Sequence, residues 1–295
     1  MRSYPKFYES LRYDCACFKE IHNTYDGKAR WTRTLKRLGE NAGAPPRGIE
    51  LDLHQCAETP YDWCVKDLGT YDNEPKNCLR RYFGQLRAWT DKHPEHDPIH
   101  VVLDLKTSRG DGELLARELD PYILESFNRA QLYAPGDLLA RGEGSLRDVA
   151  TTYGWPTIPE LFGRLIFTMS GEHDRRKKEY AAHQPTQRLC FVDQAFYTNT
   201  PTQGGPTQIV VNCEYFNTEI VGAALDWVVH RPGLLTRGYY VNTPELWASA
   251  RQAAINMIAL QNVNDTQSVG DLDLPFGFVV REELPGVPGN GGVVT

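Results

Sequence analysis

The sequence predicts an α/β protein that closes into a TIM-type (β/α)8 barrel. Short runs of apolar and β-branched residues, typical of buried strands, recur along the 295 residues. Most of these runs are separated by segments in which apolar residues have helical spacing. Strands that alternate with helices form parallel sheets. One of the nine runs breaks the alternation, and the remaining eight are the number of strands that such a barrel needs.

The strand-like runs cover residues 17–22, 48–53, 61–66, 100–105, 164–169, 189–192, 208–213, 234–241 and 256–260. Helical spacing is clearest at 79–89, 114–123 and 220–228. Too few residues separate the second and third runs for a parallel crossover. We therefore expect 61–66 to return antiparallel beside 48–53, or to lie over the barrel mouth.

No change in composition marks a second domain, so we expect residues 1–283 to form one barrel domain. Residues 284–295 are rich in proline and glycine and are expected to be a flexible tail. The stretch 137–159 separates two strands and is long enough for a short helix. Dense charge at 172–179 indicates a helix with a solvated face.

Composition argues against several classes of partner. The net charge of -6 and the lack of a long basic run give no reason to expect nucleic-acid binding. No apolar stretch approaches the 18 residues of a transmembrane helix, and the start of the chain does not read as a secretion signal. The sequence therefore predicts a cytoplasmic protein without a transmembrane segment, and leaves its oligomeric state open.

The seven cysteines lack the paired CxxC spacing of a structural zinc site. Cys17, Cys190 and Cys213 fall in apolar runs and are expected to be buried thiols. Cys56 and Cys64 flank a short turn and can pair in an oxidising compartment. Free thiols are the favoured interpretation of this pair.

The most informative stretch is 48–53, in which Glu50 and Asp52 alternate with apolar residues. In a strand this spacing places both carboxylates on one face, where they repel each other unless a cation lies between them. A hard divalent cation such as Ca²⁺ or Mg²⁺ is the simplest candidate. The alternative is an edge strand with a solvated acidic face.

Other polar residues also fall at predicted strand ends, where a barrel of this kind carries its chemistry. The first such end has His22 and Asn23, and the strand after the acidic one has Asp104 and Lys106. Later strand ends carry Asp193, Glu214, Arg237, Tyr239 and Asn242.

Three motifs then point to a known family: His22-Asn23-Thr24-Tyr25, Gly48-Ile49-Glu50-Leu51-Asp52 and Val101-Val102-Leu103-Asp104-Leu105-Lys106. Their order resembles the phospholipase C-like phosphodiesterase superfamily, and within it the calcium-dependent phosphoinositide-type phospholipase C proteins. The resemblance runs from His22 to about Asn242.

The resemblance implies a role for each matching residue. His22 would be the catalytic base, and Lys106 would contact the phosphate. Asp104 would be either a further metal ligand or a carboxylate beside the ligands. The implied metal ligands are Asn23, Glu50, Asp52 and Asp104, for Ca²⁺ or Mg²⁺. Attack by water would make the protein a hydrolase, whereas attack by a neighbouring hydroxyl of the substrate would make it a cyclising lyase.

The sequence departs from the family pattern at one position. The family has a second histidine, usually the general acid, about a dozen residues after the acidic pair, and Lys66 stands there instead. An unperturbed lysine, with a pKa near 10.4, is a slow acid. His54 should point to the same face as the carboxylates and is the alternative to Lys66.

Arg237 and Tyr239 are expected to contact substrate, although Arg237 can instead pair with an acid across the barrel and Tyr239 can be packing at the rim. The expected substrate is a small-molecule or lipid-headgroup phosphodiester. The missing histidine leaves two alternatives open. One is a barrel redirected to an elimination or cyclisation in specialised metabolism, and the other is a non-catalytic binding protein that kept the pocket.

Overall fold

The computed structural model describes most of the chain. The described residues are 6–25, 30–40, 44–56, 62–66, 78–107, 112–171, 174–196, 205–214, 233–261, 272 and 274–278. The predicted helix at 220–228 and the predicted tail at 284–295 lie outside these residues.

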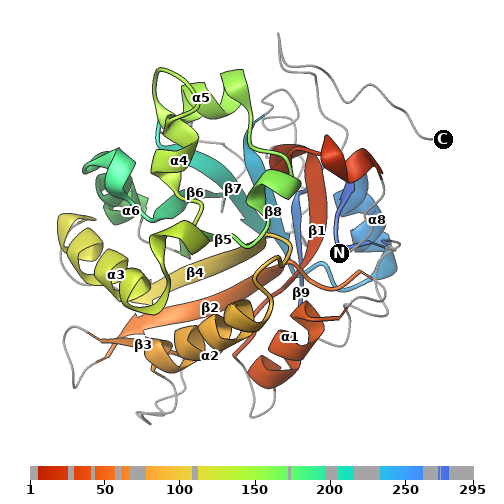
Figure 1. Ribbon diagram of the computed structural model, residues 1–295, viewed down its shortest axis with the longest axis horizontal. Coiled ribbons are helices and arrows are strands. Elements are labelled where there is room, and N and C mark those ends of the chain that lie inside the picture. The colour runs from red at the N-terminus through yellow and green to blue at the C-terminus, as the bar shows by residue number, and fades with distance from the viewer. Residues whose placement is uncertain are drawn as a thin grey trace.

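Eight parallel strands close into a barrel, which confirms the predicted TIM-type fold (Figure 1). Each strand pairs with the next along the chain, apart from the antiparallel β3, and β9 pairs with β1 to complete the ring. The barrel strands are β1 (Ala16–Ile21), β2 (Gly48–Gln55), β4 (Ile99–Thr107), β5 (Leu165–Gly171), β6 (Cys190–Phe196), β7 (Gln208–Glu214), β8 (Leu235–Tyr239) and β9 (Met257–Leu260).

Helices surround the barrel (Figure 1). They are α1 (Arg30–Leu38), α2 (Leu79–Lys92), α3 (Gly112–Ser126), α4 (Pro135–Leu139), α5 (Leu146–Tyr153), α6 (Asp174–Ala182) and α8 (Pro244–Gln252). The sequence predicted α2 and α3 from their apolar spacing. α5 lies within the stretch 137–159, in which a short helix was expected, and α4 overlaps the start of that stretch. The sequence did not predict α1, because the buried Trp31 and Leu38 are separated by mostly basic and polar residues.

Two short strands lie outside the ring. β3 (Trp63–Val65) runs antiparallel to β2, as the short connection predicted. β10 (Gly277–Phe278) pairs antiparallel with β1, and no sequence pattern predicted it. Within the described part of the chain, no helix is both long enough and apolar enough to cross a membrane.

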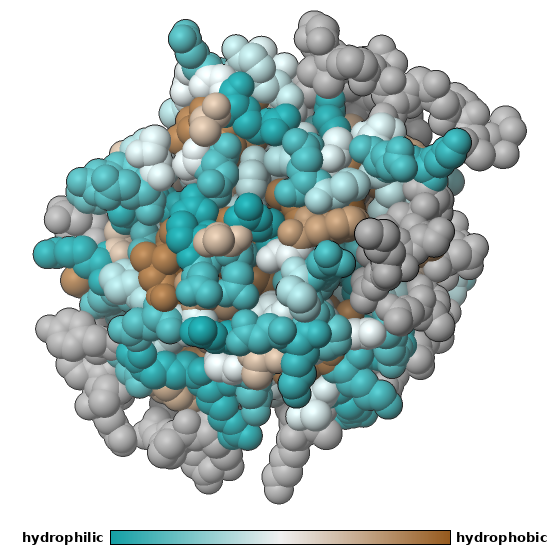
Figure 2. Space-filling model, viewed as in Figure 1, coloured by the Kyte–Doolittle hydropathy of each residue, from teal (hydrophilic) through white to brown (hydrophobic). Residues whose placement is uncertain are grey.

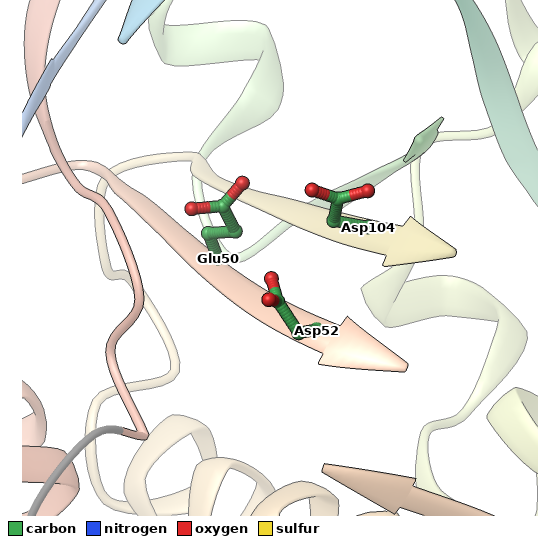
Figure 3. A group of neighbouring side chains, drawn as sticks. All are labelled: Glu50, Asp52 and Asp104. Atoms are coloured by element: carbon green, nitrogen blue, oxygen red, sulfur yellow. The ribbon is translucent and has the colours of Figure 1, made fainter. Parts of the chain in front are cut away.

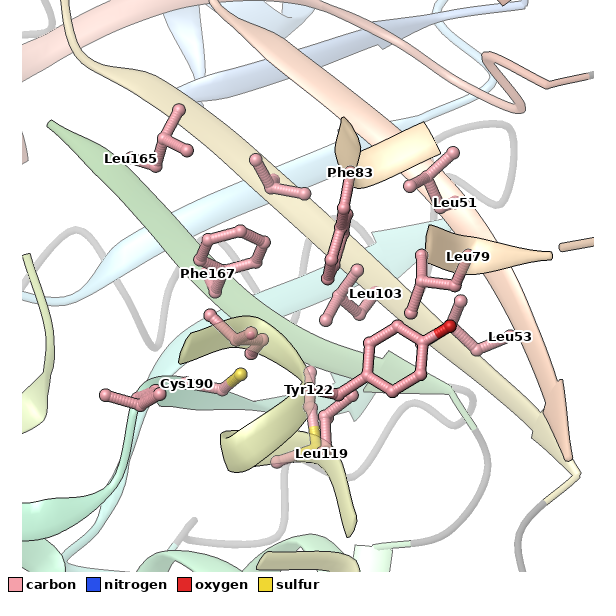
Figure 4. Packing of buried hydrophobic residues seen from close by; sticks show 14 of the residues in the cluster. Leu51, Leu53, Leu79, Phe83, Leu103, Leu119, Tyr122, Leu165, Phe167 and Cys190 are labelled. Atoms are coloured by element: carbon pink, nitrogen blue, oxygen red, sulfur yellow. The ribbon is translucent and has the colours of Figure 1, made fainter. Parts of the chain in front are cut away.

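The main hydrophobic core lies between the barrel and its helices (Figure 4). Leu51 and Leu53 of β2 and Leu103 of β4 point outward and pack against α2 and α3, where Phe83 is fully buried. Burial of one such side chain stabilises the fold by about 2 to 3 kcal/mol. The outward positions alternate with Glu50, Asp52 and Asp104, so the packing of the leucines directs these carboxylates into the barrel.

The barrel interior is apolar near the N-terminal ends of its strands. Phe18 of β1 and Phe191 of β6 lie there and are fully buried. Tyr13, Trp155 and Phe276, which precede or follow the barrel strands, pack against these two rings. This aromatic floor fills the N-terminal end of the barrel.

Cys56 and Cys64 form a disulfide with a Cα–Cα distance of 5.5 Å, so the favoured interpretation as free thiols is wrong. The antiparallel pairing of β2 with β3 is the reason, because it places the two cysteines diagonally opposite each other. Cys17, Cys190 and Cys213 are buried thiols that take part in no disulfide, as predicted.

His100 is buried in the floor, and this burial predicts acid sensitivity. Its Nδ1 lies 3.0 Å from the Tyr13 hydroxyl and its Nε2 lies 2.8 Å from Thr168 Oγ1. Burial and Arg237 lower the pKa of His100 from 6.5 to about 3. Between these values the unfolded chain binds a proton that the native state does not bind. Stability is therefore lost as the pH falls below 6.5.

At pH 4 we expect this single group to remove about 3 kcal/mol from the free energy of unfolding. Urea unfolding of the protein and of a His100→Gln variant at pH 7 and pH 4 measures the contribution. The variant is expected to be less stable at pH 7 but to lose less stability on acidification. An equal loss in both proteins would show that His100 is not responsible.

Candidate active site

Three carboxylates converge inside the barrel near the C-terminal ends of its strands (Figure 3). Glu50 and Asp52 come from β2, and Asp104 comes from the neighbouring β4, where it is the direct partner of Asp52. One oxygen from each carboxylate lies within 4.8 Å of the others. Glu50 and Asp52 therefore share a face, as the sequence predicted, and that face is turned into the barrel.

Burial and neighbouring charges change the pKa values of Glu50 and Asp52. Burial, together with the charges of Glu50 and Asp104, raises the pKa of Asp52 to about 8. Burial acts in the same direction on Glu50, but Arg237, His22 and Lys106 outweigh it and lower the pKa of Glu50 to about 2. A cation beside a carboxyl group such as that of Asp52 would stabilise its ionised form and lower its pKa.

The donor set fits a hard divalent cation. Such ions prefer carboxylate and amide oxygens, which is the chemistry that Glu50, Asp52 and Asp104 offer. Oδ1 of Asp104 is also buried and has no hydrogen-bond partner among the described residues, so a bound cation would compensate for its lost hydration.

His22 lies at the end of β1, against the carboxylate cluster. Its Nε2 is 3.4 Å from Glu50 Oε2, and its Nδ1 is 2.8 Å from Gln261 Oε1. An amide oxygen only accepts hydrogen bonds, so Nδ1 carries the proton and Nε2 has the free lone pair. Burial lowers the pKa of His22, and Arg237 adds to the effect. His22 is therefore a neutral imidazole with its basic nitrogen turned toward the carboxylates.

Asn23 adopts a left-handed conformation, with φ of 53°, which asparagine tolerates better than most residues. This turn brings its backbone N–H to Glu50 Oε2 at 3.0 Å, so the backbone helps to hold the carboxylate. The predicted role of the Asn23 side chain as a metal ligand stays a prediction.

Lys106 of β4 lies at the outer side of the cluster. Its ammonium group donates a hydrogen bond to Asp104 Oδ2 at 2.7 Å and lies 3.2 Å from Asp52 Oδ2. The carboxylates raise its pKa, so the side chain is a permanent cation. The structure thus places a positive charge beside the acidic cluster, and contact of Lys106 with a phosphate stays a prediction.

His54 and Lys66 come from the paired strands β2 and β3. Lys66 directly follows β3, and its backbone N–H donates to Asp52 O at 3.2 Å. Burial lowers the pKa of His54, and the charges of Lys66 and Lys106 lower it further. Both predicted candidates for the general acid therefore lie on the same side of the carboxylate cluster.

Tyr239 and Arg237 of β8 complete the predicted set. The Tyr239 ring stacks on His22 with centroids 5.7 Å apart. The Arg237 guanidinium is 2% exposed and is paired with Glu20 at 2.7 Å and with Glu50 at 2.9 Å. It thus pairs with acids across the barrel, the alternative that the sequence left open. Its contact with substrate stays a prediction.

Arg237 is one part of a larger polar network that fills the barrel behind the cluster. Its Nη1 donates to Asn212 Oδ1 at 3.1 Å, and Asn212 Nδ2 donates to Ser170 Oγ at 2.8 Å. Ser170 Oγ donates to Asp193 Oδ2 at 2.7 Å, and Asp193 forms an ion pair with the fully buried Lys177 of α6. The network connects a helix outside the barrel with Glu50 in the acidic cluster.

Sequence reasoning missed Glu20, Asn212 and Lys177 as members of this site. Glu20 had a usable signal, because it lies two residues before His22 in a strand and so shares its face. The structure also shows why a glycine stands at position 48: a Cβ atom there would lie 2.6 Å from Cγ of the neighbouring Glu20. Lys177 had no signal, since it lies within the charged stretch that predicted a solvated helix.

Comparison with known families confirms the predicted resemblance to the phospholipase C-like phosphodiesterase superfamily. A family model described as phosphoinositide phospholipase C, Ca²⁺-dependent, matches residues 65–204. This segment includes Asp104 and Lys106 and begins just before Lys66. A comparison with curated proteins finds no match.

Solved structures of low sequence identity share the fold. A calcium-dependent phosphoinositol-specific phospholipase C from Pseudomonas sp., in complex with myoinositol, is 18% identical with a TM-score of 0.75, over 94% of this chain and 100% of that one. A Ca²⁺-dependent phosphatidylinositol-specific phospholipase C from Streptomyces antibioticus is 17% identical with a TM-score of 0.69, over 90% and 99%. A glycerophosphodiester phosphodiesterase from Parabacteroides distasonis is 13% identical with a TM-score of 0.52, over 85% and 95%.

Proposed function

We propose that this chain cleaves phosphodiesters in a metal-dependent reaction of the phospholipase C type. The observation that carries the proposal is the convergence of Glu50, Asp52 and Asp104 beside the basic nitrogen of His22. The match of residues 65–204 to a family of calcium-dependent phospholipases supports the same chemistry.

Ca²⁺ is the proposed cofactor, with Mg²⁺ as the alternative. Asn23, Glu50, Asp52 and Asp104 would hold it, since calcium accepts both carboxylate and amide oxygens. A bound divalent cation neutralises the charge of the phosphodiester and so makes the phosphorus easier to attack. The raised pKa of Asp52 supports a cation there, because the cluster is otherwise only partly ionised at neutral pH.

His22 is the proposed general base. Gln261 fixes the proton on Nδ1, so Nε2 can take the proton of the attacking hydroxyl. The stacked ring of Tyr239 restricts the tilt of the imidazole. Arg237 holds Glu50 in place from behind, and Lys106 presents its ammonium group to the phosphate oxygens. Whether the nucleophile is water or a neighbouring hydroxyl decides between hydrolysis and cyclisation.

Lys66 is the proposed general acid, with His54 as the alternative. Both residues lie next to the cluster, on the side formed by β2 and β3. The proton donor matters most when the departing oxygen is strongly basic, because a good leaving group needs no protonation. This dependence provides a test of the assignment.

Substitution of Lys66 by methionine is expected to reduce turnover of an alkyl phosphodiester by about 100-fold. Turnover of a p-nitrophenyl phosphodiester should fall far less. Lys36→Met, which removes an exposed lysine of α1, is the matched control and should affect neither substrate. Equal losses on both substrates would remove Lys66 from the role of acid, and a Lys66→His variant would then show whether a histidine restores the family pattern.

The substrate is proposed as a water-soluble or lipid-headgroup phosphodiester. On the face in Figure 2 hydrophilic residues predominate, and hydrophobic ones lie in small groups. Among the described residues, the large hydrophobic side chains that are clearly exposed are Leu124 of α3 and Tyr153 of α5. These residues lie on different helices, so they do not define a surface for a bilayer.

The function is tested with a panel of phosphodiesters that includes glycerophosphoinositol and phosphatidylinositol vesicles. Each is assayed with Ca²⁺, with Mg²⁺ and with a chelator. Turnover that requires a divalent cation and is lost in Asp52→Asn is the expected result. Cleavage that continues unchanged in the chelator, or no cleavage of any member, would contradict the proposal.

A further inference from the structure

Three cysteines lie together beside the barrel mouth, and two of them are joined. Cys56 directly follows β2 and forms the disulfide with Cys64 of β3. Cys64 also pairs on the opposite edge of β3, through an isolated antiparallel bridge, with Cys78. Cys78 directly precedes α2 and is a half-buried free thiol. Cys64 therefore lies between its disulfide partner and a second thiol.

The backbone geometry suits either pairing. Residues directly opposite each other in an antiparallel pair point to the same face, with Cα atoms about 4.5 to 5.5 Å apart. Disulfides span Cα distances of about 4.4 to 6.8 Å. The bridge between Cys64 and Cys78 thus meets the same requirement as the observed disulfide, whose Cα–Cα distance is 5.5 Å.

The surroundings of Cys78 supply a proton acceptor. Its thiol donates to both carboxylate oxygens of Asp62, each 3.5 Å away. The Tyr122 hydroxyl lies 3.4 Å from the sulfur and donates to Asp62 Oδ1 at 2.8 Å, and Arg80 Nε lies 3.8 Å from the same oxygen. Asp62 is therefore held against the thiol, and removal of the thiol proton produces the nucleophilic thiolate.

We propose that Cys56, Cys64 and Cys78 form a thiol–disulfide exchange site. The Cys78 sulfur attacks Cys64 Sγ and forms a new S–S bond, while the bond between Cys64 and Cys56 breaks. Asp62 takes the proton of Cys78, and Cys56 leaves as a thiolate that is then protonated. One disulfide and one thiol are present before and after the step, so no oxidant or reductant is consumed.

The exchange changes which elements at the barrel mouth are linked by a disulfide. In the observed pairing the disulfide joins the end of β2, which carries His54, to β3, which Lys66 directly follows. After exchange β3 is joined to the start of α2, and β2 keeps only its hydrogen bonds to β3. The inference concerns the cysteines alone and does not depend on the proposed phosphodiesterase activity.

The main experiment maps disulfides in a Cys56→Ser variant prepared under oxidising conditions. Digestion without reduction, followed by mass spectrometry, is expected to yield a peptide in which Cys64 and Cys78 are joined. Cys15→Ser, which removes a thiol elsewhere, should retain the original disulfide. Recovery of Cys64 and Cys78 as free thiols in a folded Cys56→Ser protein would overturn the proposal.

A second experiment uses the native sequence, so that it does not depend on a variant. The folded protein is incubated at pH 8 with a trace of free cysteine and then alkylated. Exchange predicts that a fraction of molecules carries the label on Cys56 and a disulfide between Cys64 and Cys78. Asp62→Asn should slow the appearance of this species by at least about tenfold. Labelling of Cys78 alone, without the new disulfide, would contradict exchange.

Discussion

Replacement of His22 by alanine is expected to reduce phosphodiester turnover by about 10³-fold, within the range for loss of a general base. The geometry gives the reason. Gln261 holds the proton on Nδ1, so the lone pair of Nε2 faces the carboxylate cluster, and no other described histidine lies against Glu50 Oε2. The measurement is kcat/KM on the best substrate of the panel, at saturating Ca²⁺.

His183→Ala is the matched control, because it removes a histidine outside the barrel and should leave turnover unchanged. A calcium-dependent rise in melting temperature should persist in His22→Ala, since the carboxylates are intact. If His22→Ala keeps activity close to that of the unmodified protein, His22 is not the base. If it loses the calcium-dependent shift as well, the substitution has damaged the site as a whole.

The Lys177→Met substitution is expected to lower the free energy of unfolding by about 3 to 5 kcal/mol, the cost of leaving a buried charge without its partner. Lys177 is fully buried, forms an ion pair with Asp193 and donates a hydrogen bond to Gly171 O at 2.7 Å. Without it the Asp193 carboxylate must be protonated or solvated inside the barrel. Urea unfolding at pH 7 provides the measurement.

Lys178→Met tests the adjacent, exposed position of the same helix and should change stability by less than about 0.5 kcal/mol. A double variant that also carries Asp193→Asn should recover part of the loss, because the unpaired carboxylate is gone while an amide can still bond to Ser170. A loss below about 1 kcal/mol in Lys177→Met would show that water replaces the ion pair.

Much of the fold could be predicted because its signals are local. Each strand is a short apolar run, and the alternation with helices follows from the length of the connections. Even the antiparallel β3 followed from the few residues that separate it from β2. The helix α1 was missed because its buried face consists of isolated residues such as Trp31, Thr34 and Leu38 in a basic sequence. β10 was missed because two residues carry no periodicity.

The acidic cluster could be predicted for a similar reason, since alternation in β2 puts Glu50 and Asp52 on one face and Asp104 falls near the end of the next barrel strand. The direct pairing of Asp52 with Asp104 is a finding of the structure. The network behind the cluster could not be predicted. Arg237 pairs with Glu20, which is far away in the sequence, and Lys177 reaches Asp193 from outside the barrel. Such pairs depend on where separate elements meet in space, which a single sequence does not record.

The aromatic floor closes the barrel at the N-terminal ends of its strands. Phe18, Phe191 and Trp155 are fully buried and, among the described residues, fill that end, so a ligand of Asp52 is expected to enter from the side of His54 and Tyr239. Reactant and product consequently enter and leave the barrel at the same end.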